Sequence, residues 1–189
     1  MQLDIIGYFI IAIVGIGLLL ILLSGPLSSL TNGVFCFFYQ QMLHMESSYC
    51  KPSATGPNQV NVCAKSKEGC NEVATNAEEV ARIIASYAIA CWQNQRSATA
   101  TVQCYNMFLE THPGVITESM MTQIMEKEGG CKALENSKVV DDNGELVDYL
   151  GDCGTSDNIV WKVSGNFLYS QTLVSIKYDT DVKKIVIRA

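Results

Sequence analysis

An apolar run near the start is the strongest hydrophobic pattern along the chain. From Ile5 to Leu23 it holds 19 residues without a charged side chain. In a helix that rises about 1.5 Å per residue, such a run nearly spans a hydrocarbon core of about 30 Å. We therefore expect a transmembrane helix in an N-terminal unit, residues 1–30. A cleaved secretory signal fits less well, because the first four residues lack a basic side chain and Ser24-Gly25-Pro26 puts a proline at the cleavage position.

Residues 27–45 are apolar and aromatic, but polar side chains interrupt them, so no second span is expected. Three accounts stay open for this membrane-proximal segment: packing in a core, contact with the membrane interface, where aromatic rings are favoured, and contact with a partner helix. Its aromatic contact candidates are Phe35, Phe37, Phe38 and Tyr39. Residues 46–75 are rich in Ser, Pro, Gly and Asn, which predicts a long loop that cross-links must hold.

The next pattern is helical. Residues 77–93 repeat apolar side chains at helical spacing, and Asn76 with Glu79 three residues later is typical of a helix start. A shorter helix is predicted at 101–110. A third helix is predicted from Thr117 to about residue 128.

The C-terminal third changes to a period of two. Residues 159–163 and 184–188 are strand-like, and residues 167–178 alternate apolar and polar side chains between two turns. These runs predict a three-stranded antiparallel meander. The domain of residues 31–189 is thus expected to be α+β, with about three helices first and the sheet last.

Eight cysteines add cross-links to this picture. They are even in number, widely spaced and without a CxxC pair, which favours disulfides over a zinc site. The disulfide candidates are Cys36, Cys50, Cys63, Cys70, Cys91, Cys104, Cys131 and Cys153. Cys91 and Cys104 are expected to pair, because each lies beside the short 94–100 connection. Cys36 pairs within the chain, stays free or pairs between subunits.

The cysteines also set the expected location. Disulfides persist in oxidising compartments, so residues 31–189 are expected outside the cytoplasm at the cell surface, on a single-pass membrane protein. The net charge is −6, from 13 basic and 19 acidic residues, and no basic cluster occurs. Phosphate contacts need concentrated basic charge, so nucleic acid is excluded as a partner.

Candidate chemistry is sparse. The sequence has no nucleotide-binding glycine loop, HExxH or GxSxG motif, and His44 and His112 are its only histidines. Residues 141–145 superficially resemble a calcium loop, but Leu146 stands where an EF-hand needs glycine, so a polar turn is favoured over a cation site. We therefore expect no catalytic residue, no metal ligand and no cofactor.

The N-terminal segment also resembles a known family. An acid at Asp4, a pure apolar run containing Gly15 and Gly17, and a helix-breaking Pro26 are similar to the N-terminal helix of type IV pilins. In that family the subunit is stored in the membrane, and its helix then packs into a filament core while the C-terminal domain coats the outside. The resemblance covers residues 1–26, and the sequence departs from it because no basic leader or prepilin cleavage motif precedes the helix.

Three functions follow as expectations. The first is a non-enzymatic, membrane-anchored structural subunit that assembles through its N-terminal helix, in contact with membrane lipid, into a pilus-like filament or a complex with other envelope proteins. The second is an anchored receptor or adhesin whose ectodomain binds a ligand through residues 46–75. The third is an anchored enzyme with an unrecognised site.

Overall fold

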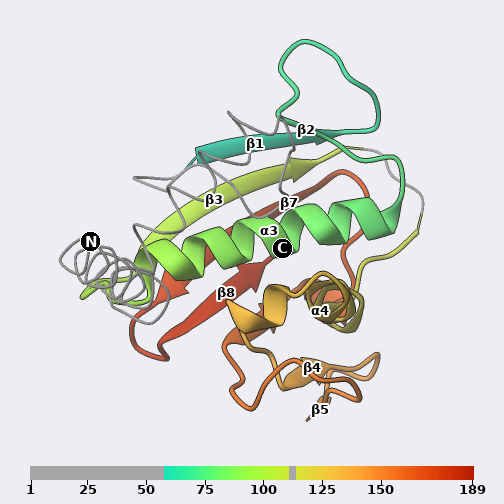
Figure 1. The fold of residues 1–189 in the computed structure, drawn as a ribbon. Coiled ribbons are helices and arrows are strands. Elements are labelled where there is room, and N and C mark those ends of the chain that lie inside the picture. The colour runs from blue at the N-terminus through green and yellow to red at the C-terminus, as the bar shows by residue number, and fades with distance from the viewer. Residues whose placement is uncertain (1–57, 111–113) are drawn as a thin grey trace, which may run out of the picture. The chain divides into compact units, whose positions relative to one another are not determined.

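A mixed six-stranded sheet forms the centre of the residues that the computed structural model describes, 58–110 and 114–189 (Figure 1). The strand order is β2-β1-β3-β7-β8-β6. β1 is parallel to β2 and β3, β6 is parallel to β8, and β7 is antiparallel to β3 and β8. The strands are β1 (Asn58–Cys63), β2 (Glu72–Val73), β3 (Val102–Leu109), β6 (Ile159–Lys162), β7 (Thr172–Asp179) and β8 (Lys184–Arg188).

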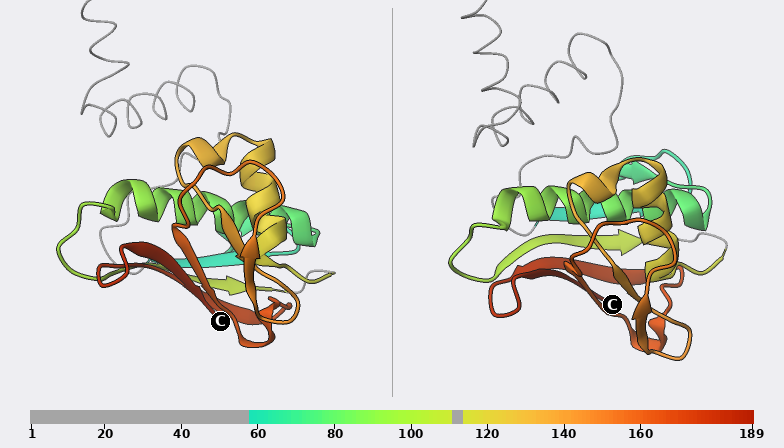
Figure 2. Two further views of the ribbon diagram at one scale, coloured as in Figure 1. Left: turned by 90° about the horizontal axis from the view of Figure 1, so that it is seen from below. Right: turned by 60° about the horizontal axis from the view of Figure 1, so that its bottom comes forward.

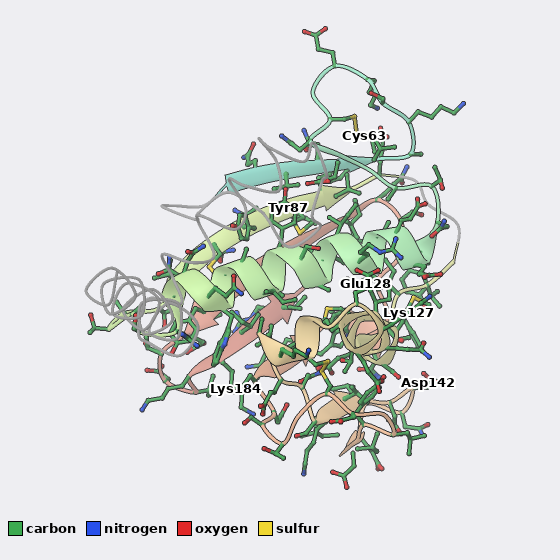
Figure 3. The ribbon with its side chains drawn as sticks, viewed as in Figure 1. Cys63, Tyr87, Lys127, Glu128, Asp142 and Lys184 are labelled. Carbon is green, nitrogen blue, oxygen red and sulfur yellow. A yellow bond between two sulfur atoms is a disulfide. The ribbon has the colours of Figure 1, made fainter. Side chains whose placement is uncertain are left out.

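The long helix α3 (Ala77–Gln95) covers one face of this sheet (Figure 2). It begins where the sequence predicts, because the Asn76 side chain accepts a hydrogen bond from the Glu79 amide at 2.9 Å. Tyr87 lies on α3 (Figure 3), and its hydroxyl donates to Glu72 Oε1 at 2.9 Å, which ties the edge strand β2 to the helix.

The two central strands divide their side chains between the two faces. On β3 and β7, alternate side chains are buried against α3: Tyr105, Met107, Leu109, Val174, Ile176 and Tyr178. The side chains between them point to the other side, because neighbouring residues of a strand face opposite ways. We call that side, opposite α3, the open face.

A second helix, α4 (Glu118–Lys127), packs against α3 on the same side of the sheet. Thr117 caps it, since its hydroxyl oxygen accepts from the Met120 amide at 3.0 Å. The Arg82 guanidinium on α3 pairs with the Glu128 carboxylate at 2.5 Å and joins the two helices. After α4 come the 3-10 turn η2 (Gly130–Lys132), the hairpin of β4 (Lys138–Val140) and β5 (Leu146–Asp148), and, beyond β6, η3 (Ser164–Asn166).

Two predicted elements are wrong in kind. Within the helix predicted at 101–110, Val102–Leu109 form the strand β3: their apolar positions fit both periods, and pairing with β1 and β7 on either side favours the strand. The C-terminal strands are not an antiparallel meander, because β6 is parallel to β8 and lies beyond it, away from β7. A period of two reveals a strand but not its direction or its neighbour.

The predicted fold class is therefore corrected. The described part of the chain has two α-helices, not three, and a mixed sheet whose strands also come from residues 58–63 and 72–73, within the predicted long loop. Within residues 58–110 and 114–189 no helix is long and apolar enough to cross a membrane. This finding contradicts the predicted N-terminal transmembrane helix and single-pass membrane localisation, and the segment that suggested them, residues 1–30, lies outside the described residues.

Candidate functional site

Three disulfides cross-link the described domain. They join Cys63 to Cys70, Cys91 to Cys104, and Cys131 to Cys153. The predicted Cys91–Cys104 pair is confirmed, and it fastens the core of α3 to β3 rather than to a second helix. No described cysteine is free. Cys36 and Cys50 lie outside the described residues.

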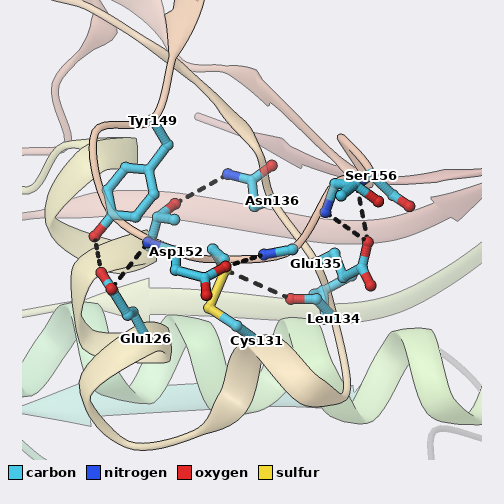
Figure 4. The surroundings of a disulfide bond; sticks show 12 residues. Glu126, Cys131, Leu134, Glu135, Asn136, Tyr149, Asp152 and Ser156 are labelled. Atoms are coloured by element: carbon cyan, nitrogen blue, oxygen red, sulfur yellow. Dashed lines mark hydrogen bonds between the residues drawn. A yellow bond between two sulfur atoms is a disulfide. The ribbon is translucent and has the colours of Figure 1, made fainter.

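The Cys131–Cys153 bridge closes the segment that carries η2, β4 and β5 (Figure 4). We call residues 131–153 the disulfide lobe. Closing a loop of this length restricts the unfolded chain and contributes about 3 kcal/mol of stability in the chain-entropy account. The lobe is thus fixed covalently at both ends.

A carboxylate from α4 holds the end of the lobe. Glu126 accepts hydrogen bonds from the Tyr149 hydroxyl at 2.7 Å and from the Asp152 amide at 2.9 Å (Figure 4). These bonds, the amide first, lower the pKa of Glu126. Gly151 lies between them, and a Cβ there would collide with the Glu126 carboxylate and the Tyr149 ring. A larger residue here would have to displace the Glu126 carboxylate and the Tyr149 ring.

A second carboxylate fixes the chain just after the lobe. Glu135 accepts from the Ser156 amide at 2.8 Å and from the Thr155 amide at 3.1 Å. Hydrogen bonds from Ser156 and Thr155 lower its pKa. Gly154, at φ +83°, turns the chain into these bonds in a conformation that favours glycine.

A buried polar network lies beneath the lobe. Glu118, 1% exposed at the start of α4, accepts from the Val140 amide at 2.8 Å and from Asn136 Nδ2 at 3.2 Å. Asn136 Nδ2 also donates to the buried Thr122 hydroxyl at 2.9 Å. Burial raises the pKa of Glu118 to about 7, and the nearby Asp157 charge adds to the rise. The network joins α4 to β4.

An ion pair continues this network toward the main sheet. Lys184 on β8 donates to Asp157 Oδ2 at 2.6 Å, while Asp157 Oδ1 and Asn136 Oδ1 are buried and receive no hydrogen bond from a described residue. A carboxyl group with a pKa near 7 is suited to proton transfer. Here both Glu118 oxygens bind structural donors, so the arrangement supports the lobe rather than presenting a reactive group.

The outer surface of the lobe is apolar and acidic. Leu146 is 54% exposed and Leu150 is fully exposed, with Val147 beside them. A depression of about 330 Å³ separates this surface from the start of α4, with Thr117, Ser119 and Tyr149 among its lining residues. Leu146, Val147 and Leu150 are thus accessible to a binding partner.

The acidic turn 141–145 is held by its own backbone. Asp141 Oδ1 accepts from the Glu145 amide at 2.8 Å and the Asn143 amide at 2.9 Å, and these bonds lower the pKa of Asp141. The carboxylate that would begin a calcium loop is thereby engaged in a polar turn. In the described part of the chain no group of three or more His, Cys, Asp or Glu side chains is arranged to hold a metal.

The chain matches no known family model, and neither a curated protein nor a solved structure is detectably similar to it. The assembly residues proposed from the sequence lie outside the described residues: Asp4, Gly15, Gly17, Pro26, Phe35, Phe37, Phe38 and Tyr39. The resemblance to type IV pilins therefore stays a prediction.

The sequence indicated Cys131 and Cys153 as disulfide candidates, but not the carboxylates that hold the lobe. Glu118 is an acid in the first turn of a helix, where exposure is the ordinary expectation. Only the packing of β4 over it reveals its burial. The exposed apolar residues of β5 gave a weak signal, because they follow a polar turn in an otherwise acidic stretch.

Proposed function

We propose that this protein is a non-enzymatic structural subunit whose disulfide lobe docks onto a protein partner, in a compartment where disulfides persist. The observation that carries the proposal is Leu150, which is fully exposed on a backbone fixed by Cys131–Cys153 and by Glu126. Leu146 and Val147 extend the apolar surface. Exposed apolar patches with a polar rim mark protein-binding sites.

Rigidity favours this use. A side chain that is already held in place loses little conformational entropy when a partner covers it, so more of the contact energy appears as affinity. The two carboxylate clamps and the disulfide provide that rigidity around an otherwise short hairpin. Large apolar side chains at the centre of a patch commonly supply most of the binding energy.

Site-specific photo-crosslinking in the producing cells tests the proposal. A photoreactive amino acid at Leu150 is expected to give protein crosslinks. The same group at Val182, which is 51% exposed in the turn between β7 and β8, serves as the matched control. Equal crosslinking at the two positions would reject the lobe as a docking surface.

A receptor or adhesin is the second candidate, and the depression beside the lobe is the observation that favours it. Ser119 lines this depression from α4, and Leu150 lines it from the lobe. For a ligand in the depression, Ser119→Trp is expected to abolish ligand binding.

A further inference from the structure

The open face of the sheet carries an exposed apolar pair. Phe108 on β3 and Leu173 on β7 are register partners, 43% and 61% exposed. Beside them Gln103 Nε2 donates to Asn106 Oδ1 at 3.3 Å and to Ser175 Oγ at 3.0 Å. These bonds order the neighbouring side chains and leave the apolar pair accessible.

Two cations lie next to this pair. Lys162 on β6 and Arg188 on β8 are register partners and both are exposed. Arg188 is also the register partner of Ser175, two residues from Leu173, so it lies within diagonal reach of the apolar pair. We call Lys162 and Arg188 the basic corner.

Neither side chain of the basic corner forms an ion pair with a described residue, although the charge of Lys162 contributes to the lowered pKa of Asp179. The other two cations of these strands are ion-paired, Lys177 with Asp179 at 2.7 Å and Lys184 with Asp157 at 2.6 Å. No described carboxylate lies within ion-pair distance of Lys162 or Arg188. Like charges on facing strands destabilise a sheet, so this arrangement is explained more readily by an external acidic partner than by stability.

The disulfide lobe has the complementary chemistry. Residues 141–152 include no basic residue and five acids, which are Asp141, Asp142, Glu145, Asp148 and Asp152. Asp142, Glu145 and Asp152 form no ion pair with a described residue. These acids accompany Leu146, Val147 and Leu150, just as the basic corner accompanies Phe108 and Leu173.

We propose that the partner of the disulfide lobe is the open face of a second copy of this chain. The inference rests on the proposed function and names its partner. Apolar residues of the lobe cover Phe108 and Leu173, while the lobe acids face Lys162 and Arg188 of the other copy. A chain of net charge −6 repels its own copies, so local complementarity of this kind is what brings two copies together. Each copy carries both surfaces, so the contact can repeat from copy to copy.

Charge reversal in the full chain tests this contact. K162E/R188E makes the basic corner acidic, and D142K/E145K places two lysines on the lobe and lowers the net negative charge of residues 141–152 from −5 to −1. K162E/R188E places acids against the lobe acids, and D142K/E145K places lysines against the basic corner and removes two of its acidic partners, so self-association of either variant in sedimentation equilibrium is expected to weaken about tenfold or more. Mixing the two variants restores opposite charges at every contact and is expected to recover association. The control K65E/K127E makes the same change in net charge as K162E/R188E, on exposed lysines of the 64–71 loop and of α4.

All samples are measured in one mild detergent, which keeps the apolar residues 5–23 dispersed. Recovery in the mixture also shows that both variants are folded. The inference is overturned if the wild-type chain stays monomeric at every concentration reached, or if both reversed variants associate as the wild type does. Association that is lost in Leu150→Asp but unchanged in K162E/R188E would likewise overturn it, and would leave the docking function of the lobe in place.

Discussion

At the scale of single residues, Glu118 connects burial to pH. Its ordinary pKa is 4.5, and burial in the fold raises it to about 7. Between these values the folded chain holds a proton that the unfolded chain has released. The free energy of unfolding contributed by Glu118 therefore falls as pH rises through this window, and it is largest below pH 4.5. The change amounts to about 3 kcal/mol.

The variant Glu118→Gln cannot ionise, so we expect it to lack this decline. Urea unfolding at about pH 5 and about pH 8 gives the unfolding free energy at each pH. We expect the decrease between the two pH values to be smaller in the variant than in the wild type. Glu145→Gln removes one exposed carboxylate from the same lobe and serves as the control. If the unfolding free energy of Glu118→Gln decreases with pH as much as that of the wild type, the raised pKa of the buried Glu118 carboxyl is contradicted.

Gly151 is a second single-residue test, because its missing Cβ is what leaves room for the Glu126 carboxylate. We expect Gly151→Ala to displace that carboxylate from Tyr149 and Asp152 and to cost about 1–3 kcal/mol of unfolding free energy. In Glu126→Ala the carboxylate is gone and only the Tyr149 ring still has to shift, so adding Gly151→Ala is expected to cost less. Additive effects in this double-mutant cycle would argue against the collision.

At the scale of elements, the disulfides divide into internal and peripheral bridges. Cys91 and Cys104 are fully buried between α3 and β3, whereas Cys63–Cys70 closes a short exposed loop. Replacing Cys91 and Cys104 together by alanine is expected to lower the unfolding free energy by about 3 kcal/mol or more, because the cross-link is lost and a cavity is created. The matched double variant at 63 and 70 is expected to cost less, as measured by chemical unfolding.

The helix α3 forms where the sequence predicts it, whereas the helix predicted at 101–110 is replaced by the strand β3. α3 contains its own start signal, with Asn76 bonded to the Glu79 amide, and its apolar stripe has a helical period. Residues 102–109 have no comparable cap and fit either period. β1 and β7 supply hydrogen-bonding partners on both sides, and these long-range pairs override a weak local preference.

At the scale of the whole molecule, the proposed contact between copies depends on charge. Exposed opposite charges are screened by salt, with a Debye length of about 10 Å at 0.1 M. We expect association of the full chain to weaken as NaCl rises from about 0.05 M to about 0.5 M. The apolar part of the contact is insensitive to this screening, so association is expected to persist in reduced form. Association that strengthens steadily with salt would point to apolar contact alone.

The sequence by itself determined what local chemistry controls. It indicated the helix after Asn76, the polar turn after Asp141, disulfide cross-linking and the Cys91–Cys104 pair, because caps, turns and short-range bridges involve residues close together in the chain. The tertiary structure alone decided the order and direction of the strands, the burial of Glu118 and the exposure of Leu150. Those properties depend on which distant segments pack together, and a period of two or an acid in a first turn is compatible with several such arrangements.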